Sequence, residues 1–309
     1  MNEPKQTSTH TYHADDRNQS ILININGELF KREEAKISVF DSAFMLGDGV
    51  WEGLRVHNGK IAFLKRHLKR LYGGAKALDF NLGITKEELV ERINHTLTAN
   101  NMIEGVHLRV MVSRGTKSTP YQDPRVTISA PTIVIVPEYK EALPETVETG
   151  INVFTVHIRR GAPDVQDPKL NSHSKINCIL ACIQATKAGA DEALMLDPQG
   201  FVATCNSTHF FIIKDGKVIT SSGQYCIDGV TRGTVLDICN EEGIPCAQTQ
   251  FSLSDVYSAD EAFVTGTFAG LVPVCSVDGR DIGSAKRGPV VKKLQQLYMR
   301  CIEQECTIG

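Results

Sequence analysis

Three short segments of alternating apolar residues each turn on a small dipeptide, and these dipeptides restrict the fold more than any other feature of the sequence. The dipeptides are Asn26-Gly27, Asn58-Gly59 and Asp215-Gly216. Asn, Asp and Gly tolerate the left-handed backbone of a type I′ turn, whose twist matches that of paired strands. The sequence therefore predicts three antiparallel hairpins, two early in the chain and one in its second half.

Helical and strand patterns fill the rest of the first half. KRHLKRLYGGAKAL has helical spacing, and a second helix is predicted to begin at Thr85, where Glu88 completes a capping box. VHLRVMVSRG then alternates from Val106 onward, and a strand-like TIVIV occupies 132–136. We expect these segments to form a small α+β domain over residues 21–138.

The second half begins after PEYKEALPETVETG, whose two prolines and four glutamates favour an interdomain connector at 139–148. A larger domain is expected over 149–309, with helices after Gly229 and from Pro289. Residues 1–20 are polar and are expected to be a disordered tail. A further helix is predicted to bury a periodic apolar face made of Ile176, Ile179, Leu180 and Ile183.

Composition excludes several classes of partner. The formal net charge is −3, from 33 basic and 36 acidic residues. The chain therefore lacks the excess of positive charge that binding to nucleic acid or an anionic membrane would favour. No apolar run approaches the length of about 20 residues that spans a bilayer. The nine cysteines are scattered, without a CxxC pair, so we expect free thiols in a reducing, cytoplasmic compartment and no metal site.

Some residues indicate anion binding without reference to any family. Gly229-Val230-Thr231 lies at an expected helix start, where free N–H groups favour a phosphate. Thr265-Gly266-Thr267 is a strand end followed by small residues, and an arginine can bind carboxylate or phosphate bidentately. Each feature alone is commonplace, since helices often start after glycine and a single arginine is usually solvated. The arginines of interest are Arg70, Arg109 and Arg114.

The joint order of the motifs resembles the class IV (fold type IV) aminotransferases, closest to the branched-chain branch. The resemblance rests on LGDGVWEGLRVHNGK, HLKRL, VSRG, GADEALMLDPQGFV, DGVTRG, ADEAFVTGTFAGLVPV and VDGRDIG. It implies a two-domain fold like that of D-amino-acid aminotransferase, with a smaller N-terminal α+β domain and a larger β-barrel-like α/β domain. It also implies a homodimer that binds pyridoxal 5'-phosphate. The implied phosphate contacts are Arg70, Gly229, Val230, Thr231, Gly266 and Thr267.

Two positions depart from the family pattern. The family lysine that bonds to the cofactor aldehyde aligns with Asn171 or its neighbour, and the glutamate beside the pyridine nitrogen aligns with Thr204. Lys175 takes the place of a family tyrosine near the cofactor's phenolic oxygen, so we expect its amine to reach the aldehyde; Lys169 is the alternative. A hydroxyl at 204 holds the pyridine nitrogen protonated less well than a carboxylate does.

Substrate contacts are expected from Arg109 and Arg114, for the α-carboxylate, and from Trp51, as a pocket wall or as core filling. Glu52 and Asp48 are expected to be structural. The resulting hypothesis is a transaminase that moves an amino group from an apolar, branched-chain amino acid to a 2-oxo acid. The alternatives are a lyase of the aminodeoxychorismate type, a D-amino-acid transaminase, and a relative that binds the cofactor without transamination.

Overall fold

The computed structural model describes residues 8–307, and these residues divide into two compact units. The large unit contains residues 8–12, 142–169 and 176–301, and the small unit contains 13–141 and 170–175 together with the end of the chain. Residues 170–175 were expected in the larger domain, but they group with the small unit. This grouping places Asn171 and Lys175 in the same unit as Trp51 and Arg70.

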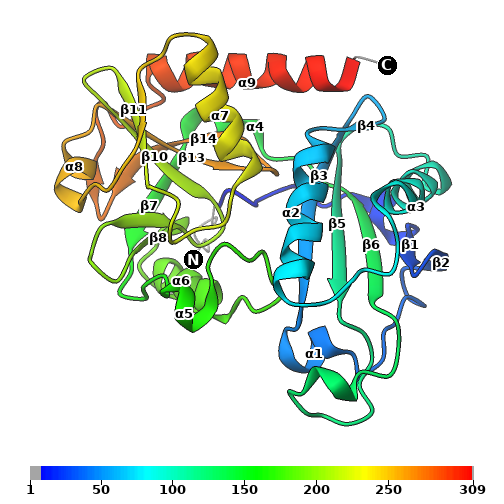
Figure 1. Ribbon diagram of the computed structural model, residues 1–309. Coiled ribbons are helices and arrows are strands. Elements are labelled where there is room, and N and C mark those ends of the chain that lie inside the picture. The colour runs from blue at the N-terminus through cyan, green and yellow to red at the C-terminus, as the bar shows by residue number, and fades with distance from the viewer. Residues whose placement is uncertain (1–7, 308–309) are drawn as a thin grey trace, which may run out of the picture. The chain divides into compact units, whose positions relative to one another are not determined.

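The small unit is built on a six-stranded antiparallel sheet (Figure 1). Its strands run in the spatial order β2-β1-β6-β5-β3-β4. The first two predicted hairpins are confirmed, because Asn26 and Asn58 have φ values of 54° and 51° between paired strands. The strand bounds are β1 Leu22–Ile25, β2 Glu28–Lys31, β3 Gly49–His57, β4 Lys60–Ile61, β5 Val106–Ser113 and β6 Thr132–Tyr139.

Two helices cover one face of this sheet, with α2 (Leu64–Ala77) on β3 and α3 (Lys86–Ala99) on β1 and β6. The capping box is confirmed: Thr85 accepts from the Glu88 N–H, and the Glu88 carboxylate accepts from the Thr85 N–H. Apolar side chains of β5 and α3 are almost fully buried between the layers, each worth about 1.5–3 kcal/mol. They include Leu89, Ile93, Val106, Leu108, Val110 and Val112.

The face of β3 and β5 opposite the two helices carries the side chains of candidate site residues. Strand alternation puts Val50 and Leu54 in the core and turns Trp51 and Arg109 to the other face. The unit also contains α1 (Ser42–Leu46) and the 3-10 helices η1 (Asp16–Gln19) and η2 (Pro124–Val126).

The large unit contains a nine-stranded mixed sheet. Its main path is β12-β11-β10-β13-β14-β7-β8-β9. The sheet is curled, since Ser221, directly after β11, donates to the Ala203 carbonyl of the end strand β9 at 2.6 Å. The third hairpin is confirmed at Asp215, with φ of 49°. The strand bounds are β7 Ile151–Thr155, β8 Glu192–Leu196, β9 Val202–Cys205, β10 His209–Lys214, β11 Lys217–Thr220, β12 Cys246–Gln248, β13 Glu261–Gly266, β14 Gly270–Val277 and β15 Arg280–Asp281.

The helices of the large unit include the two predicted after Gly229 and from Pro289. Leu294, Leu297 and Tyr298 of the closing helix are buried. The helix bounds are α4 Pro144–Thr149, α5 Pro163–Gln166, α6 Ile176–Lys187, α7 Val230–Glu241, α8 Leu253–Tyr257 and α9 Pro289–Thr307, the last of which continues into the small unit.

The expected burial of the apolar face of α6 is wrong. Ile176, Ile179, Leu180 and Ile183 are 65%, 50%, 44% and 45% exposed, whereas Ala181 and Ala185 are buried. The alanines face β7 and β8 because their small side chains let the helix lie close to the sheet. The large aliphatic side chains therefore form an exposed apolar face.

Two segments expected to lack structure contain ordered elements. Residues 144–148 of the expected connector belong to α4 (Pro144–Thr149), which begins with a proline at its first turn. Within the expected tail, η1 forms at 16–19 and Asn18 exchanges hydrogen bonds with the backbone of Tyr139 at 2.9 and 2.8 Å. Residues 1–7 of that tail lie outside the described residues.

Between residues 8 and 307, no helix is long and apolar enough to cross a membrane. The same part of the chain holds no group of His, Cys, Asp and Glu side chains placed to bind a metal ion.

Candidate active site

Residues 170–175 extend the edge of β3 in the small unit. The Trp51 N–H donates to the Asn171 carbonyl at 3.0 Å, the His173 N–H donates to the Gly49 carbonyl at 3.0 Å, and Val50 and Ser172 form an antiparallel bridge. This pairing fixes the backbone on which both Asn171 and Lys175 stand.

The amine of Lys175 lies beside the side chain of Asn171. Its Nζ donates to Oδ1 of Asn171 at 3.1 Å and lies 5.4 Å from the centroid of the Trp51 ring, and Nδ2 of Asn171 donates to the Trp51 carbonyl at 2.6 Å. The guanidinium of Arg109 stacks over the same ring at 3.9 Å. The structure thus brings together Lys175, Trp51 and Arg109. Lys169 is exposed and belongs to the large unit.

Arg70 of α2 is held in one orientation by a buried carboxylate. Its Nε and Nη2 donate to the two oxygens of Glu52, both at 2.7 Å, and Nδ1 of His67 lies 2.7 Å from Glu52 Oε2. Burial acts to raise the pKa of Glu52, but the charge of Arg70 and the hydrogen bonds from Arg70 and His67 outweigh it, so this pKa lies below its usual value. The expected structural role of Glu52 is in keeping with this network.

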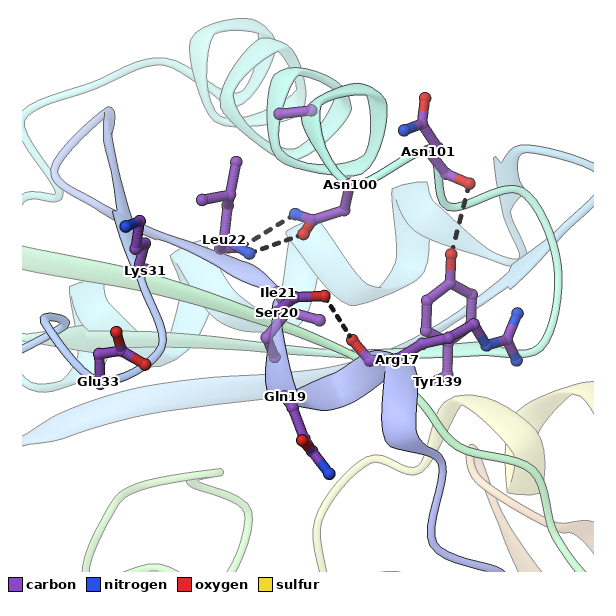
Figure 2. A pocket seen from close by; sticks show the side chains of 11 residues that line it. Arg17, Gln19, Ser20, Ile21, Leu22, Lys31, Glu33, Asn100, Asn101 and Tyr139 are labelled. Atoms are coloured by element: carbon purple, nitrogen blue, oxygen red, sulfur yellow. Dashed lines mark hydrogen bonds between the residues drawn. The ribbon is translucent and has the colours of Figure 1, made fainter.

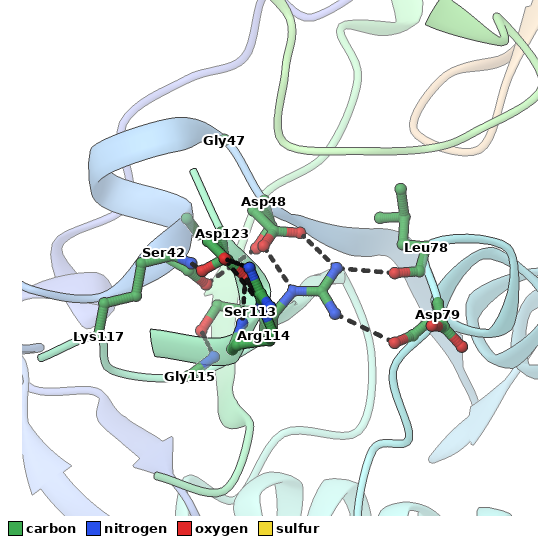
Figure 3. A network of polar contacts seen from close by, with 12 residues as sticks. Ser42, Gly47, Asp48, Leu78, Asp79, Ser113, Arg114, Gly115, Lys117 and Asp123 are labelled. Carbon is green, nitrogen blue, oxygen red and sulfur yellow. Dashed lines mark hydrogen bonds and ion pairs between the residues drawn. The ribbon is translucent and has the colours of Figure 1, made fainter. Parts of the chain in front are cut away.

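Arg114 is tied into a separate network at the end of β5 (Figure 3). Its guanidinium donates to both carboxylate oxygens of Asp48, at 2.6 and 3.2 Å, and to the carbonyls of Leu78 and Asp79, at 2.7 and 3.1 Å. Four hydrogen bonds to its own unit favour a structural role over the expected carboxylate-binding role. Arg109 remains the better carboxylate candidate.

In the large unit, α7 begins at a helix start that carries no side-chain cap. Gly229 is the N-cap residue, and the first helical residues are Val230 and Thr231. A Cβ at 229 would lie 2.3 Å from Cε1 of His209, so only glycine fits against that ring. The unpaired N–H groups of a helix start, with the positive end of the helix dipole, suit an anion.

Thr265, which the sequence analysis named as part of Thr265-Gly266-Thr267 but not as an expected phosphate contact, adds a hydroxyl. It is fully buried, and among the described residues its Oγ1 has no hydrogen-bond partner. Thr265 pairs directly with His209 across β13 and β10, so its side chain lies on the sheet face that carries His209 and meets the start of α7. Gly266 and Thr267 follow it at the strand end. An uncapped helix start beside a buried, unpaired hydroxyl fits a phosphate group.

Thr204 is buried in β9, and its hydroxyl donates to the Thr208 carbonyl at 2.8 Å. Because the proton is used in this bond, the oxygen keeps its capacity to accept a hydrogen bond. Glu192, on the neighbouring strand β8, is fully buried and accepts from the hydroxyls of Ser207 and Thr208 at 2.7 and 2.8 Å. Sequence reasoning used Glu192 only as part of a motif.

The expected site residues therefore fall into two groups, one in each unit. The small unit holds Trp51, Arg70, Arg109, Arg114 and Lys175, and the large unit holds Thr204, Gly229, Val230, Thr231, Gly266 and Thr267.

A pocket of about 660 Å³ lies elsewhere in the small unit (Figure 2). Arg17, Lys31, Asn100 and Tyr139 are among its lining residues, and none of the expected site residues lines it. The amide of Asn100 is used to bind the backbone of Leu22, and Tyr139 stacks beneath Arg17 at 3.6 Å.

Comparison with known proteins shows the family of this chain. A model of the class IV amino-transferase family matches residues 49–277. The chain belongs to this family. The Arabidopsis thaliana branched-chain-amino-acid aminotransferase-like protein 2 is 40% identical over 283 residues, which are 92% of this chain and 50% of that protein. The putative branched-chain-amino-acid aminotransferase of Methanocaldococcus jannaschii is 39% identical over 280 residues, which are 89% of this chain and 94% of that protein.

Solved structures agree with the fold. The branched-chain aminotransferase of the archaeon Thermoproteus uzoniensis superimposes with a TM-score of 0.84 at 28% identity, covering 93% of this chain and 96% of that one. Another branched-chain amino acid aminotransferase, solved with pyridoxamine 5'-phosphate, gives a TM-score of 0.87 at 30% identity, covering 93% and 95% of the two chains. The resemblance drawn from the motifs and the expected two-domain α+β fold are confirmed. The chain spans about half the length of the two Arabidopsis relatives, 50% and 51%.

Proposed function

We propose that this chain is a pyridoxal-phosphate-dependent aminotransferase that moves an amino group from an apolar, branched-chain amino acid to a 2-oxo acid. Its family and the names of its relatives support the reaction class. The observation that carries the cofactor assignment is the buried, unpaired hydroxyl of Thr265 beside the uncapped start of α7. When bound, pyridoxal phosphate supplies the aldehyde that takes up the amino group and the ring that accepts electrons from the substrate's Cα.

Phosphate binding is proposed for groups at the start of α7 and at the end of β13, and for Arg70. Val230 and Thr231 offer backbone N–H groups and a hydroxyl, and Gly266 and Thr267 offer the same at the end of β13. Arg70 contributes a guanidinium whose plane Glu52 fixes, which lowers the entropy lost when an anion binds.

Lys175 is proposed to hold the cofactor aldehyde covalently and to move the proton at the substrate's Cα. The proposal is supported by its Nζ, which lies 3.1 Å from Asn171 Oδ1, so that the amine reaches the side chain standing in the family lysine's place. The exposure of Lys169 counts against the alternative lysine.

Thr204 is proposed to lie beside the pyridine nitrogen. Because the Thr204 hydroxyl donates its proton to the Thr208 carbonyl, it can bond to the ring nitrogen only as an acceptor. Such a bond requires that the ring nitrogen be protonated. A neutral hydroxyl stabilises that protonated form less than a carboxylate does, so the proton transfer should depend more heavily on Lys175.

For the substrate, we propose that Trp51 walls the side-chain pocket and that Arg109 binds the carboxylate. The stacking of Arg109 on Trp51 at 3.9 Å supports a joint role, because the ring holds the guanidinium in place. The apolar ring favours an apolar amino acid as donor.

A second candidate function is a relative that binds the cofactor without transamination. The observation in its favour is that Asn171 and Thr204 replace two groups with which the family performs chemistry.

Borohydride reduction of the cofactor-loaded chain, followed by peptide mass mapping, tests these proposals. We expect a pyridoxyl label on Lys175, its absence from the Lys175→Ala variant, and normal labelling of the Lys169→Ala control. Transamination from leucine to 2-oxoglutarate should fall by at least about 10³-fold in Lys175→Ala, a loss in the range seen when a central catalytic group is removed. A loaded chain with no labelled lysine would favour the second candidate.

We also propose a homodimer, supported by the exposed apolar face of α6. Four large aliphatic side chains on one helix exceed the scattered apolar exposure of ordinary surfaces. Light scattering should give twice the chain mass, and Ile179→Glu with Ile183→Glu should shift it towards the monomer, whereas the exposed Thr186→Glu on the same helix should not. A monomeric wild-type chain would contradict the proposal.

A cytoplasmic location is proposed because all nine cysteines are free thiols. Fractionation of cells that express the chain tests it, and recovery in a secreted fraction would contradict it.

A further inference from the structure

Residues 8–12 belong to the large unit, although they precede the small unit in the chain. Thr9 is 3% exposed, and its Oγ1 donates to Oε2 of Glu192 at 3.0 Å. The segment is shaped by a turn in which the Thr11 N–H donates to the Ser8 carbonyl at 3.1 Å. This segment precedes the first residue matched by the family model, Gly49, and is distinct from the motifs that identify the family.

The Glu192 carboxylate joins this segment to the turn after β9. One oxygen accepts from Thr9, and the other accepts from the hydroxyls of Ser207 and Thr208. The backbone carbonyl of Thr208 in turn accepts the hydroxyl of Thr204. A chain of short polar contacts thus leads from Thr9 to Thr204.

A second contact joins the segment to the loop after β13. The His10 ring stacks on the Phe268 ring, with centroids 5.6 Å apart and planes 17° apart. Phe268 directly follows Gly266 and Thr267. Thr9 and Thr208 of the first contact and His10 and Phe268 of the second line one small cavity. The two contacts are therefore neighbours on the same surface of the large unit.

We propose that residues 8–12 form a strap that positions the cofactor-binding groups of the large unit. Thr9 acts through Glu192 on the turn that orients Thr204, and His10 acts through Phe268 on the loop that presents Gly266 and Thr267. This inference rests on the proposed binding of pyridoxal phosphate. Thr9 and His10 are positioning residues and do not touch the cofactor.

The test measures the dissociation constant of pyridoxal phosphate and the absorption maximum of the bound cofactor between pH 6 and 9. Thr9→Val keeps the shape of the side chain and removes the hydroxyl, and His10→Ala removes the stacking ring. Thr9→Ser and His10→Phe restore the hydroxyl and the ring. Thr249→Val, at an exposed threonine of the same unit, is the matched control.

We expect Thr9→Val to weaken binding about tenfold, which corresponds to about 1.4 kcal/mol. His10→Ala should weaken it about fivefold, and both variants should shift the pH dependence of the absorption maximum. Thr9→Ser, His10→Phe and Thr249→Val should resemble the wild type. The melting temperature of the cofactor-free chain is measured in parallel, because a purely structural role would lower it without changing the spectrum.

The outcomes separate the two proposals. Wild-type chain that binds no pyridoxal phosphate refutes the proposed function, and the strap with it. Wild-type chain that binds the cofactor, while Thr9→Val and His10→Ala match it in affinity and spectrum, overturns the strap alone, whatever happens to the melting temperature. If Thr9→Val fails to fold, His10→Ala against His10→Phe gives the same decision.

Discussion

Replacing Glu52 with glutamine removes a buried negative charge that faces Arg70 and His67. The Glu52 side chain is 2% exposed and that of Arg70 is 14% exposed, so water replaces little of the lost interaction. Breaking a buried ion pair by removing one partner typically costs about 3–5 kcal/mol. The amide oxygen of glutamine still accepts one hydrogen bond, so we expect the lower end, a loss of about 3 kcal/mol in the free energy of unfolding of the small unit.

Urea unfolding followed by the fluorescence of Trp51 measures this loss, because the chain has a single tryptophan and it adjoins Glu52 in the small unit. The exposed Glu33→Gln is the charge-matched control. The same substitution should weaken pyridoxal-phosphate binding, since the guanidinium of Arg70 would no longer be held in one plane.

The pH dependence of this loss has a definite sign. The folded-state pKa of Glu52 lies below its ordinary value, so the carboxylate stabilises the folded state fully above the unfolded pKa of about 4.3. That stabilisation is lost as the pH falls through the lowered folded-state pKa. The difference between wild type and Glu52→Gln should therefore be largest near pH 7 and shrink towards pH 3. Equal stabilities at pH 7, or a difference that stays constant down to pH 3, would refute the reasoning.

Three further substitutions give separate tests. Gly229→Ala would place a Cβ 2.3 Å from His209, so we expect a loss of stability of about 1–3 kcal/mol and weaker cofactor binding, and unchanged values would contradict the close packing. In Gly73→Ala the added Cβ in α2 meets nothing within 4 Å, so the free energy of unfolding should rise by up to about 1 kcal/mol. A lower free energy of unfolding in urea would contradict this prediction. Thr85→Ala removes the side-chain half of the α3 capping box and should cost about 1 kcal/mol by the same assay; no change would mean that water replaces the cap.

Features that depend on neighbouring residues could be predicted from the sequence. The turns at Asn26, Asn58 and Asp215 follow from backbone preferences within two residues, and the capping box at Thr85 needs only a partner three residues away. The start of α7 after Gly229 is of the same kind. These elements are local, so distant parts of the chain do little to change them.

Features that depend on distant parts of the chain could not be predicted in this way. The periodic isoleucines of α6 satisfy the pattern of a buried face, but alanines face the sheet because the spacing to β7 and β8 admits only small side chains. Arg114 donates its four hydrogen bonds to Asp48, Leu78 and Asp79, which lie 35 or more positions away in the chain. A lone arginine in the sequence carries no sign of such partners.

The pairing of residues 171–173 with β3 explains how Asn171 and Lys175 can act together. Asn171 uses its amide nitrogen on the Trp51 carbonyl and its amide oxygen on the Lys175 amine, so its side chain is fixed from both ends. Under the proposed function, position 171 no longer bonds to the cofactor but orients the amine that does. The asparagine is thus compatible with a lysine that works from four residues further along the chain.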